Sequence, residues 1–282
     1  MKGKDLISPY LYIGHACNNN CLFCSEADSK FPKKTLGQIK KEILSVRGKY
    51  DFINFMGREP TLREDFFSIL KFAGSKKFKK IGITTNGRLF SYPGFAKRVL
   101  ISRVNQIGIT LNGATPKTHD FLTQVPGSFE QTLQGIKNIV RYKTKNQSLL
   151  INFPLNKINA SELNRYLAMI EKLKIKETNI LHVAPLSRRS EKKEMIIQMR
   201  EGGKLAFDSA KIYIKKNRMK ILLVEFLPCS LKKKARKYFF PCMEKNPQKI
   251  RISLCKKCPY TSKCDGVLKS YIKMYGENEF KL

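Results

Sequence analysis

Short apolar runs alternate along the chain with longer stretches in which apolar residues recur every three or four positions. The short runs end in turn residues such as Asn-Gly and predict β-strands, whereas the longer stretches predict amphipathic helices. We expect strands at 10–16, 51–57, 81–87, 104–113, 148–156 and 178–186. We expect helices at 35–50, 63–77, 91–101, 127–142 and 160–174, and a long charged helix from Arg188 onward.

Six strand–helix units in succession predict an α/β fold with a parallel sheet, because right-handed crossovers return each strand in the same direction. Six units are too few for a closed eight-stranded barrel, so the expectation is a partial (β/α)6 TIM-like barrel with its site at the carboxyl ends of the strands. From about residue 219 the pattern changes to a short strand and a cysteine-rich tail. We therefore predict a core domain at 1–218 and a small C-terminal extension at 219–282.

The chain has 282 residues, 42% of them hydrophobic, which is enough for a sizeable core. Its longest apolar run, at 221–227, has the length of a strand and not of a membrane span. The N-terminal residues lack the apolar stretch of a signal peptide. We therefore expect a cytoplasmic protein, in which clustered cysteines indicate metal ligands or catalytic groups more readily than disulfides.

The formal net charge is +33, from 55 Lys and Arg against 22 Asp and Glu. A field of that sign attracts polyanions, so RNA is a candidate partner. The positive residues are spread over the whole chain, however, and a solvated lysine-rich surface explains them equally well.

Three of the eight cysteines, Cys17, Cys21 and Cys24, lie within eight positions and follow the first predicted strand. The C-x3-C-x2-C spacing supplies three thiolates, which can hold three irons of a [4Fe–4S] cube and leave the fourth iron open. A zinc site is the alternative, with a fourth ligand from elsewhere; His15 is the nearest candidate. The two remaining histidines, His119 and His182, lie in no motif, and we expect structural roles for them.

The cysteine motif and the stretch "MGREPTL" after the second strand resemble the radical S-adenosylmethionine (SAM) enzymes, over about residues 8–186. The resemblance implies that SAM binds the open iron. An electron from the cluster then cleaves SAM to methionine and a 5′-deoxyadenosyl radical, which abstracts a hydrogen atom from the substrate. It also implies an external electron donor such as flavodoxin or ferredoxin.

The resemblance further implies which residues contact SAM. Phe23 occupies the aromatic position near the adenine, and Thr110 and Asn112 lie where the family has a polar pair at the ribose. "GREPT" resembles the family's GGEPT motif, which binds the SAM amino group, and gives the candidates Gly57, Glu59 and Pro60. The chain departs from this motif at Arg58, where the family has a second glycine.

A second cysteine group, "CKKCPYTSKCDG", contains Cys255, Cys258 and Cys264. It is similar to the SPASM or twitch extensions of radical SAM proteins, which bind an auxiliary [4Fe–4S] cluster. The SPASM pattern continues with a further cysteine where this chain has Leu268, so a fourth ligand is needed from upstream. Cys229 and Cys242 are both candidates; we favour Cys229 because it follows a predicted strand end. A four-thiol zinc knuckle is the alternative.

The interpretation is a radical SAM enzyme with SAM, a [4Fe–4S] cluster and an auxiliary [4Fe–4S] cluster as cofactors. The extension resembles those of members that modify peptides, so a peptide or protein substrate is expected first. Modification of an RNA base is the second hypothesis. The third is a non-catalytic Fe–S or zinc protein that binds nucleic acid.

Overall fold

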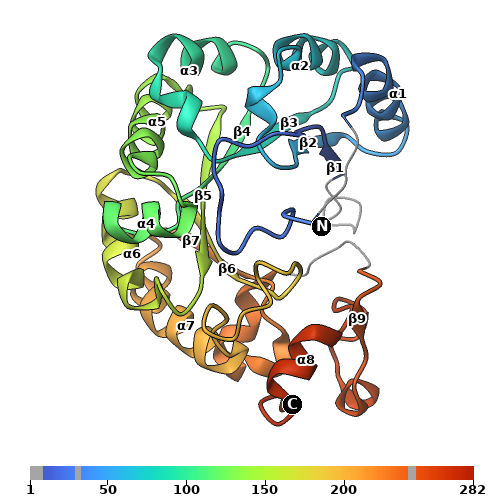
Figure 1. Ribbon diagram of the computed structural model, residues 1–282, viewed down its shortest axis with the longest axis vertical. Coiled ribbons are helices and arrows are strands. Elements are labelled where there is room, and N and C mark those ends of the chain that lie inside the picture. Colours follow the sequence, from blue (N-terminus) through green and yellow to red (C-terminus); the bar gives the residue numbers. More distant parts are fainter. Residues whose placement is uncertain (1–8, 29–32, 241–245) are drawn as a thin grey trace.

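The structure is a computed structural model that describes residues 9–28, 33–240 and 246–282. Its main feature is one parallel sheet in which the strands lie in their order along the chain, from β1 to β8. The strands are β1 (Tyr10–Tyr12), β2 (Phe52–Met56), β3 (Lys80–Thr85), β4 (Gln106–Thr110), β5 (Ser148–Leu155), β6 (Glu177–His182), β7 (Lys220–Val224) and β8 (Phe239–Phe240). The sheet curves into an open barrel-like arc (Figure 1).

Helices cover the outer side of this arc (Figure 1). They are α1 (Leu36–Arg47), α2 (Phe66–Ser75), α3 (Pro93–Leu100), α4 (Pro116–Thr123), α5 (Ser128–Tyr142), α6 (Leu163–Lys172) and α7 (Met199–Lys215). Short 3-10 helices lie between them: η2 (Pro60–Leu62), η3 (Arg88–Ser91) and η4 (Ala160–Glu162). Fully buried residues such as Phe55, Ile83 and Ile151 pack against helix residues such as Ile43 and Ile139 in one continuous core. Among the described residues, no helix is both long and apolar enough to cross a membrane.

The predicted partial barrel is confirmed, but the sheet holds eight strands and not six. The two additional strands, β7 and β8, come from the segment after residue 218. Ile221 and Leu223 of β7 are buried in the main core, so this strand packs as a continuation of the barrel. Two-residue β8 carries no periodic pattern from which it could be predicted.

The long helix expected from Arg188 onward begins eleven residues later, at Met199. The preceding segment, 187–198, consists mainly of turns and irregular backbone. The backbone N–H groups of Leu186 and Ser187 both donate to the Ser190 hydroxyl, which stabilises a turn in place of a helical start. The sequence prediction was wrong here because serine side chains compete locally for backbone hydrogen bonds.

The C-terminal extension packs beside the open edge of the arc (Figure 1). It contains η5 (Pro228–Ser230), η6 (Lys233–Tyr238), η7 (Ser253–Lys257) and helix α8 (Lys269–Tyr275). A small antiparallel pair is formed by β9 (Lys249–Ile250) and β10 (Val267–Leu268). A second apolar cluster around Tyr271 joins this extension to the loop after β6, through Val183 and Ile196.

Candidate functional site

The loop after β1 carries Cys17, Cys21 and Cys24 at the carboxyl end of the sheet. The backbone of helix α4 holds it, since the N–H groups of Asn20 and Leu22 donate to the carbonyls of Thr123 and Leu122, each at 2.9 Å. Because the loop is anchored on both sides of Cys21, its three thiols are kept in one short arc. Cys17 is exposed and the other two are half-buried.

Two arginines from distant loops also bind this segment. Arg88, which starts η3, donates to the carbonyl of Asn18 and to Oδ1 of Asn19, the latter at 3.0 Å. Arg189, in the turn segment after β6, donates to the Asn20 carbonyl at 3.3 Å. The cysteine loop is therefore held from both flanks by side chains with a permanent positive charge.

Burial raises the pKa of each of the three thiols, that of Cys21 to about 12. Repulsion from Cys24 and Cys17 adds to the shift at Cys21. These partly desolvated thiols are uncharged until they bind a positively charged centre, which stabilises their thiolate forms. The donor set therefore fits iron ligation, and its count of three fits a cluster with one open iron.

The "GREPT" stretch forms a tight turn directly after β2. Gly57 and Arg58 both have positive φ, +89° and +35°. A Cβ on Gly14 would lie 2.0 Å from the Gly57 carbonyl oxygen, so the first loop and this turn touch through their backbones. Arg58, the departure from the family motif, is exposed, and its positive charge opposes the rise in the pKa of Cys24.

Glu59 is buried, and its carboxylate bonds to the protein itself. Oε1 accepts the Thr61 N–H at 3.1 Å and the Thr85 hydroxyl at 2.7 Å, and Oε2 accepts the Asn86 N–H at 2.7 Å. Burial raises the pKa of Glu59, and these hydrogen bonds oppose that shift. The Glu59 side chain thus joins the segments that follow β2 and β3. Because its carboxylate is occupied by these hydrogen bonds, a ligand at this turn would contact the backbone, which enters η2 at Pro60.

The end of β4 places Thr110 half-buried and Asn112 buried. The Asn112 backbone is engaged: its N–H donates to Nδ1 of His119 at 3.1 Å and its carbonyl accepts from Asn159 at 2.9 Å. Oδ1 of the Asn112 side chain is buried and has no hydrogen-bond partner in the described part of the chain. An unsatisfied acceptor at this strand end fits a ligand hydroxyl or an ordered water. The Nδ1 contact of His119 agrees with the structural role predicted for it.

A cavity of about 450 Å³ lies inside the barrel. Among its lining residues, the sequence predicted a binding role only for Phe23 and a structural role for His182. Its polar lining comes from successive strands and from the end of β7: Asn54, Thr84, Gln106, Asn152, Asn179, His182 and Glu225. Asn54 donates to Thr84 at 2.9 Å, and Asn179 to Asn152 at 3.1 Å. The signal in the sequence was an amide or hydroxyl inside an otherwise apolar strand, repeated in neighbouring strands.

Phe23 and Ser25, the two neighbours of Cys24, also line this cavity. Phe23 in addition packs against the apolar cluster of the C-terminal extension. The cysteine loop therefore lies at the mouth of the barrel cavity and contacts both parts of the molecule.

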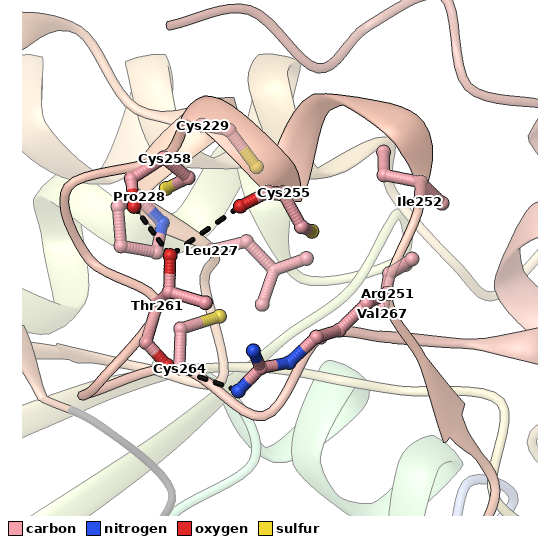
Figure 2. A pocket seen from close by; sticks show the side chains of 11 residues that line it. Leu227, Pro228, Cys229, Arg251, Ile252, Cys255, Cys258, Thr261, Cys264 and Val267 are labelled. Atoms are coloured by element: carbon pink, nitrogen blue, oxygen red, sulfur yellow. Dashed lines mark hydrogen bonds between the residues drawn. The ribbon is translucent and has the colours of Figure 1, made fainter.

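The second cysteine group comes together in the extension. Cys229, Cys255, Cys258 and Cys264 lie around one small pocket (Figure 2). Burial raises the pKa of Cys229 to about 12, with further repulsion from Cys264 and Cys258. Four thiols around one pocket supply the number of ligands that a closed Fe–S cluster or a zinc site requires. The rival ligand Cys242 lies outside the described residues.

Local hydrogen bonds shape this second site. The Thr261 hydroxyl donates to the Cys258 carbonyl, and the Cys258 N–H donates to the Cys255 carbonyl at 3.2 Å. Cys229 is fixed from the C-terminal side by the Lys281 N–H, which donates to its carbonyl at 2.9 Å.

Within the described ranges, no three His, Cys, Asp or Glu side chains stand in an arrangement that could hold a single metal ion.

Comparison with known proteins identifies the family. The family model described as "Radical SAM superfamily" matches residues 11–170. The chain therefore belongs to the radical SAM superfamily, whose members are enzymes.

Three curated relatives of this chain illustrate the breadth of the superfamily. A probable GTP 3′,8-cyclase of Saccharolobus solfataricus is 25% identical over 65% of this chain and 59% of its own length. An AdoMet-dependent heme synthase of Methanosarcina barkeri is 29% identical over 64% and 51%. An S-adenosylmethionine-dependent nucleotide dehydratase of Selenomonas ruminantium is 31% identical over 54% and 57%. The chain thus spans less than two thirds of these relatives.

Solved structures share the fold over a longer part of the chain. The structure of anSMEcpe with bound AdoMet and the Kp18Cys peptide superposes with a TM-score of 0.65 at 15% identity, covering 98% of this chain and 93% of that one. Streptococcus suis SuiB bound to its precursor peptide SuiA gives a TM-score of 0.64 at 15% identity, covering 79% and 50%. At such identities the likeness shows the fold alone.

Proposed function

We propose that this chain cleaves SAM at a [4Fe–4S] cluster held by Cys17, Cys21 and Cys24 and modifies a peptide or protein. The observation that carries the proposal is the position of Phe23 and Ser25, which flank Cys24 and line the barrel cavity. A radical formed beside this loop would meet a substrate group inside the cavity without crossing solvent. Such shielding is needed because an exposed radical reacts with whatever is nearest.

When bound, the cluster supplies the electron that cleaves SAM to methionine and a 5′-deoxyadenosyl radical. The protein's part is to bind and orient SAM. The backbone from Gly57 to Pro60 would receive the SAM amino group, Phe23 the adenine, and Thr110 and Asn112 the ribose. The unsatisfied Oδ1 of Asn112 supports the last assignment. An external donor such as flavodoxin or ferredoxin would supply the electron, in the cytoplasm.

For residues 219–282 we propose an auxiliary role, although β7 belongs structurally to the barrel sheet. Cys229, Cys255, Cys258 and Cys264 would hold a second [4Fe–4S] cluster. With four protein thiolates that cluster has no open iron, so it would serve as an electron acceptor or as a structural element.

Two observations support the proposal of a peptide or protein substrate. The fold likeness to anSMEcpe with a bound peptide extends through the extension, whereas the likeness to the curated relatives covers about two thirds of the chain. The cavity lining is mostly neutral, with amides and hydroxyls that suit a side chain or a peptide group.

The test is SAM cleavage by anaerobically reconstituted protein under reduction. Wild-type protein should form 5′-deoxyadenosine and methionine and hold about eight irons if both sites are cubes. Replacing Cys17, Cys21 and Cys24 by Ala should abolish cleavage and leave about four irons. The matched control replaces Cys255, Cys258 and Cys264, which should also remove about half of the iron. Undiminished cleavage in the first variant would refute the proposal; zinc in the extension would refute its second cluster.

Modification of an RNA base is the second candidate, and the net charge of +33 is the observation that favours it. Any protein this basic binds polyanions at low salt, so binding alone decides nothing. A cognate RNA should remain bound in a large excess of heparin at near-physiological salt. It should also raise the rate of SAM cleavage above the rate without substrate. If a peptide stimulates cleavage and RNA does not, the lysines are a solvated surface.

A further inference from the structure

Glu225 occupies an unusual place in the barrel cavity. It follows β7 directly, at the carboxyl end of the sheet, and its backbone has a φ of +61°. A non-glycine residue in this left-handed region is disfavoured, and such conformations cluster where function requires a particular side-chain position. Here the turn leaves Glu225 as part of the cavity wall.

The charge of Glu225 contrasts with the strand side chains around the cavity. The polar ones from β2 to β6 are amides, one hydroxyl and the imidazole of His182, and several of the amides and the hydroxyl already bond to one another across neighbouring strands. Glu225 adds a carboxylate to this neutral lining, with about a quarter of its side chain exposed. A charged group in a partly desolvated cavity discriminates between ligand charges much more strongly than the same group on the surface.

Glu225 is held in place by a buried lysine from the extension. The ammonium of Lys249 lies 3.5 Å from Oε2 of Glu225 and 3.0 Å from Oδ1 of Asp265, and only 6% of the Lys249 side chain is exposed. Oδ2 of Asp265 is buried and has no hydrogen-bond partner among the described residues. Among the described residues, this group contains two carboxylates and one ammonium, so a second cation near Glu225 would bring its net charge closer to zero.

We infer that Glu225 selects the substrate: it accepts the ammonium of a lysine or the guanidinium of an arginine in a peptide that enters the barrel. This inference rests on the proposed function, because it assumes that the cavity receives the substrate. A charge-assisted hydrogen bond to the carboxylate favours such a group. A phosphate or a substrate carboxylate would be repelled by Glu225, so the same residue disfavours a nucleotide.

The experiment measures peptide binding to the reconstituted full-length protein, with and without SAM. The probes are fluorescent hexapeptide pools with neutral flanking residues and a central Lys, Arg, Gln or Glu. About 0.3 M salt screens the general surface charge. Wild-type protein should bind the Lys or Arg pool roughly tenfold more tightly than the Gln pool. Glu225→Gln should reduce this ratio to about one, and Glu225→Lys should invert it in favour of the Glu pool.

The matched control is Glu177→Gln, which removes a carboxylate at the opposite end of the neighbouring strand β6. It should keep the wild-type ratio. Glu225→Asn is a second test variant, because asparagine tolerates the left-handed backbone if Gln does not fold. Equal binding of all pools by wild-type protein, or a cationic preference that persists in both neutral variants, would overturn the inference. SAM cleavage is scored separately, so a protein that shows the preference without cleaving SAM would refute only the proposed function.

Discussion

The carboxylate of Glu59, at the end of β2, accepts the backbone N–H of Asn86, at the end of β3, over 2.7 Å. Asn86 in turn donates from its side chain to Oδ1 of Asn18 at 2.6 Å. A continuous path of hydrogen bonds therefore runs from the "GREPT" turn to the cysteine loop. Glu59 acts on the cofactor site through the loops that it holds in place.

Glu59→Gln should destabilise the protein because one carboxylate oxygen becomes an NH2 donor. Either the Asn86 N–H or the hydroxyls of Thr61 and Thr85 then lose their acceptor. We expect a loss of about 1–3 kcal/mol in the free energy of unfolding. Urea unfolding measures it, and SAM affinity should fall together with stability. A variant as stable as wild type would show that the network contributes nothing.

Gly14→Ala should disturb the same site from the other side. Its Cβ would lie 2.0 Å from the Gly57 carbonyl, so the "GREPT" turn has to move. Overpacking of this kind costs about 1–3 kcal/mol. The control is Gly94→Ala in α3, where an added Cβ meets nothing within 4 Å and a helical Gly→Ala change is neutral or stabilising. The midpoint temperature of thermal unfolding should therefore fall for Gly14→Ala and stay the same or rise for Gly94→Ala.

Arg88→Gln should make the first cluster harder to reduce. Reduction adds negative charge, and the Arg88 guanidinium, bonded to Asn18 and Asn19 beside Cys17, stabilises that charge. Its removal should lower the reduction potential by on the order of tens of millivolts. Arg98→Gln is the control, because Arg98 stacks on Phe67 at the outer helices. Redox titration followed by electron paramagnetic resonance gives the two potentials, and identical values would contradict this role.

Cys229→Ser should change the spectrum of the proposed auxiliary cluster, because Cys229 shares its pocket with Cys255, Cys258 and Cys264. Cys242→Ser is the matched variant and should leave that spectrum unaltered. Resonance Raman or Mössbauer spectra of both proteins decide between them. The reverse pattern would assign the fourth ligand to Cys242.

The Arg63–Asp65 pair should make stability depend on pH. Arg63 is 3% exposed, bonds Asp65 at 2.7 Å and donates to the Ile13 carbonyl at 3.0 Å, just before the cysteine loop. The hydrogen bonds from Arg63 lower the pKa of Asp65. A lowered carboxyl pKa contributes stability that is present above the unfolded value, about pH 4, and is lost as pH falls through the folded value.

Asp65→Asn should therefore cost about 1–2 kcal/mol at pH 7 and progressively less below about pH 4. Urea unfolding at several pH values measures the difference between the two proteins. A cost that does not change with pH would mean that packing, and not charge, explains the effect.

The sequence predicted the strand–helix order and the cysteine groups because these depend on local periodicity and spacing. The membership of β7 in the barrel sheet was not predicted, since it depends on packing of Ile221 and Leu223 against distant residues. Asn54, Asn152 and Glu225 were missed for a related reason. A single polar residue in a strand, or directly after one, forms no recognisable sequence motif. Its position in the cavity wall is visible only once the curvature of the sheet is known.

The hydrogen bonds from Ser187 and Arg189 to the cysteine loop also affect the order in which the site forms during folding. The Ser187 hydroxyl bonds the Cys24 carbonyl across 163 positions of sequence, and Arg189 reaches Asn20 across 169. Contacts this distant form late, because the entropy of closing the intervening chain is lost before they compensate for it. The three thiols are therefore translated well before the residues that hold their loop in place. Iron delivered before the sixth strand has joined the sheet would meet a loop that does not yet have its final shape.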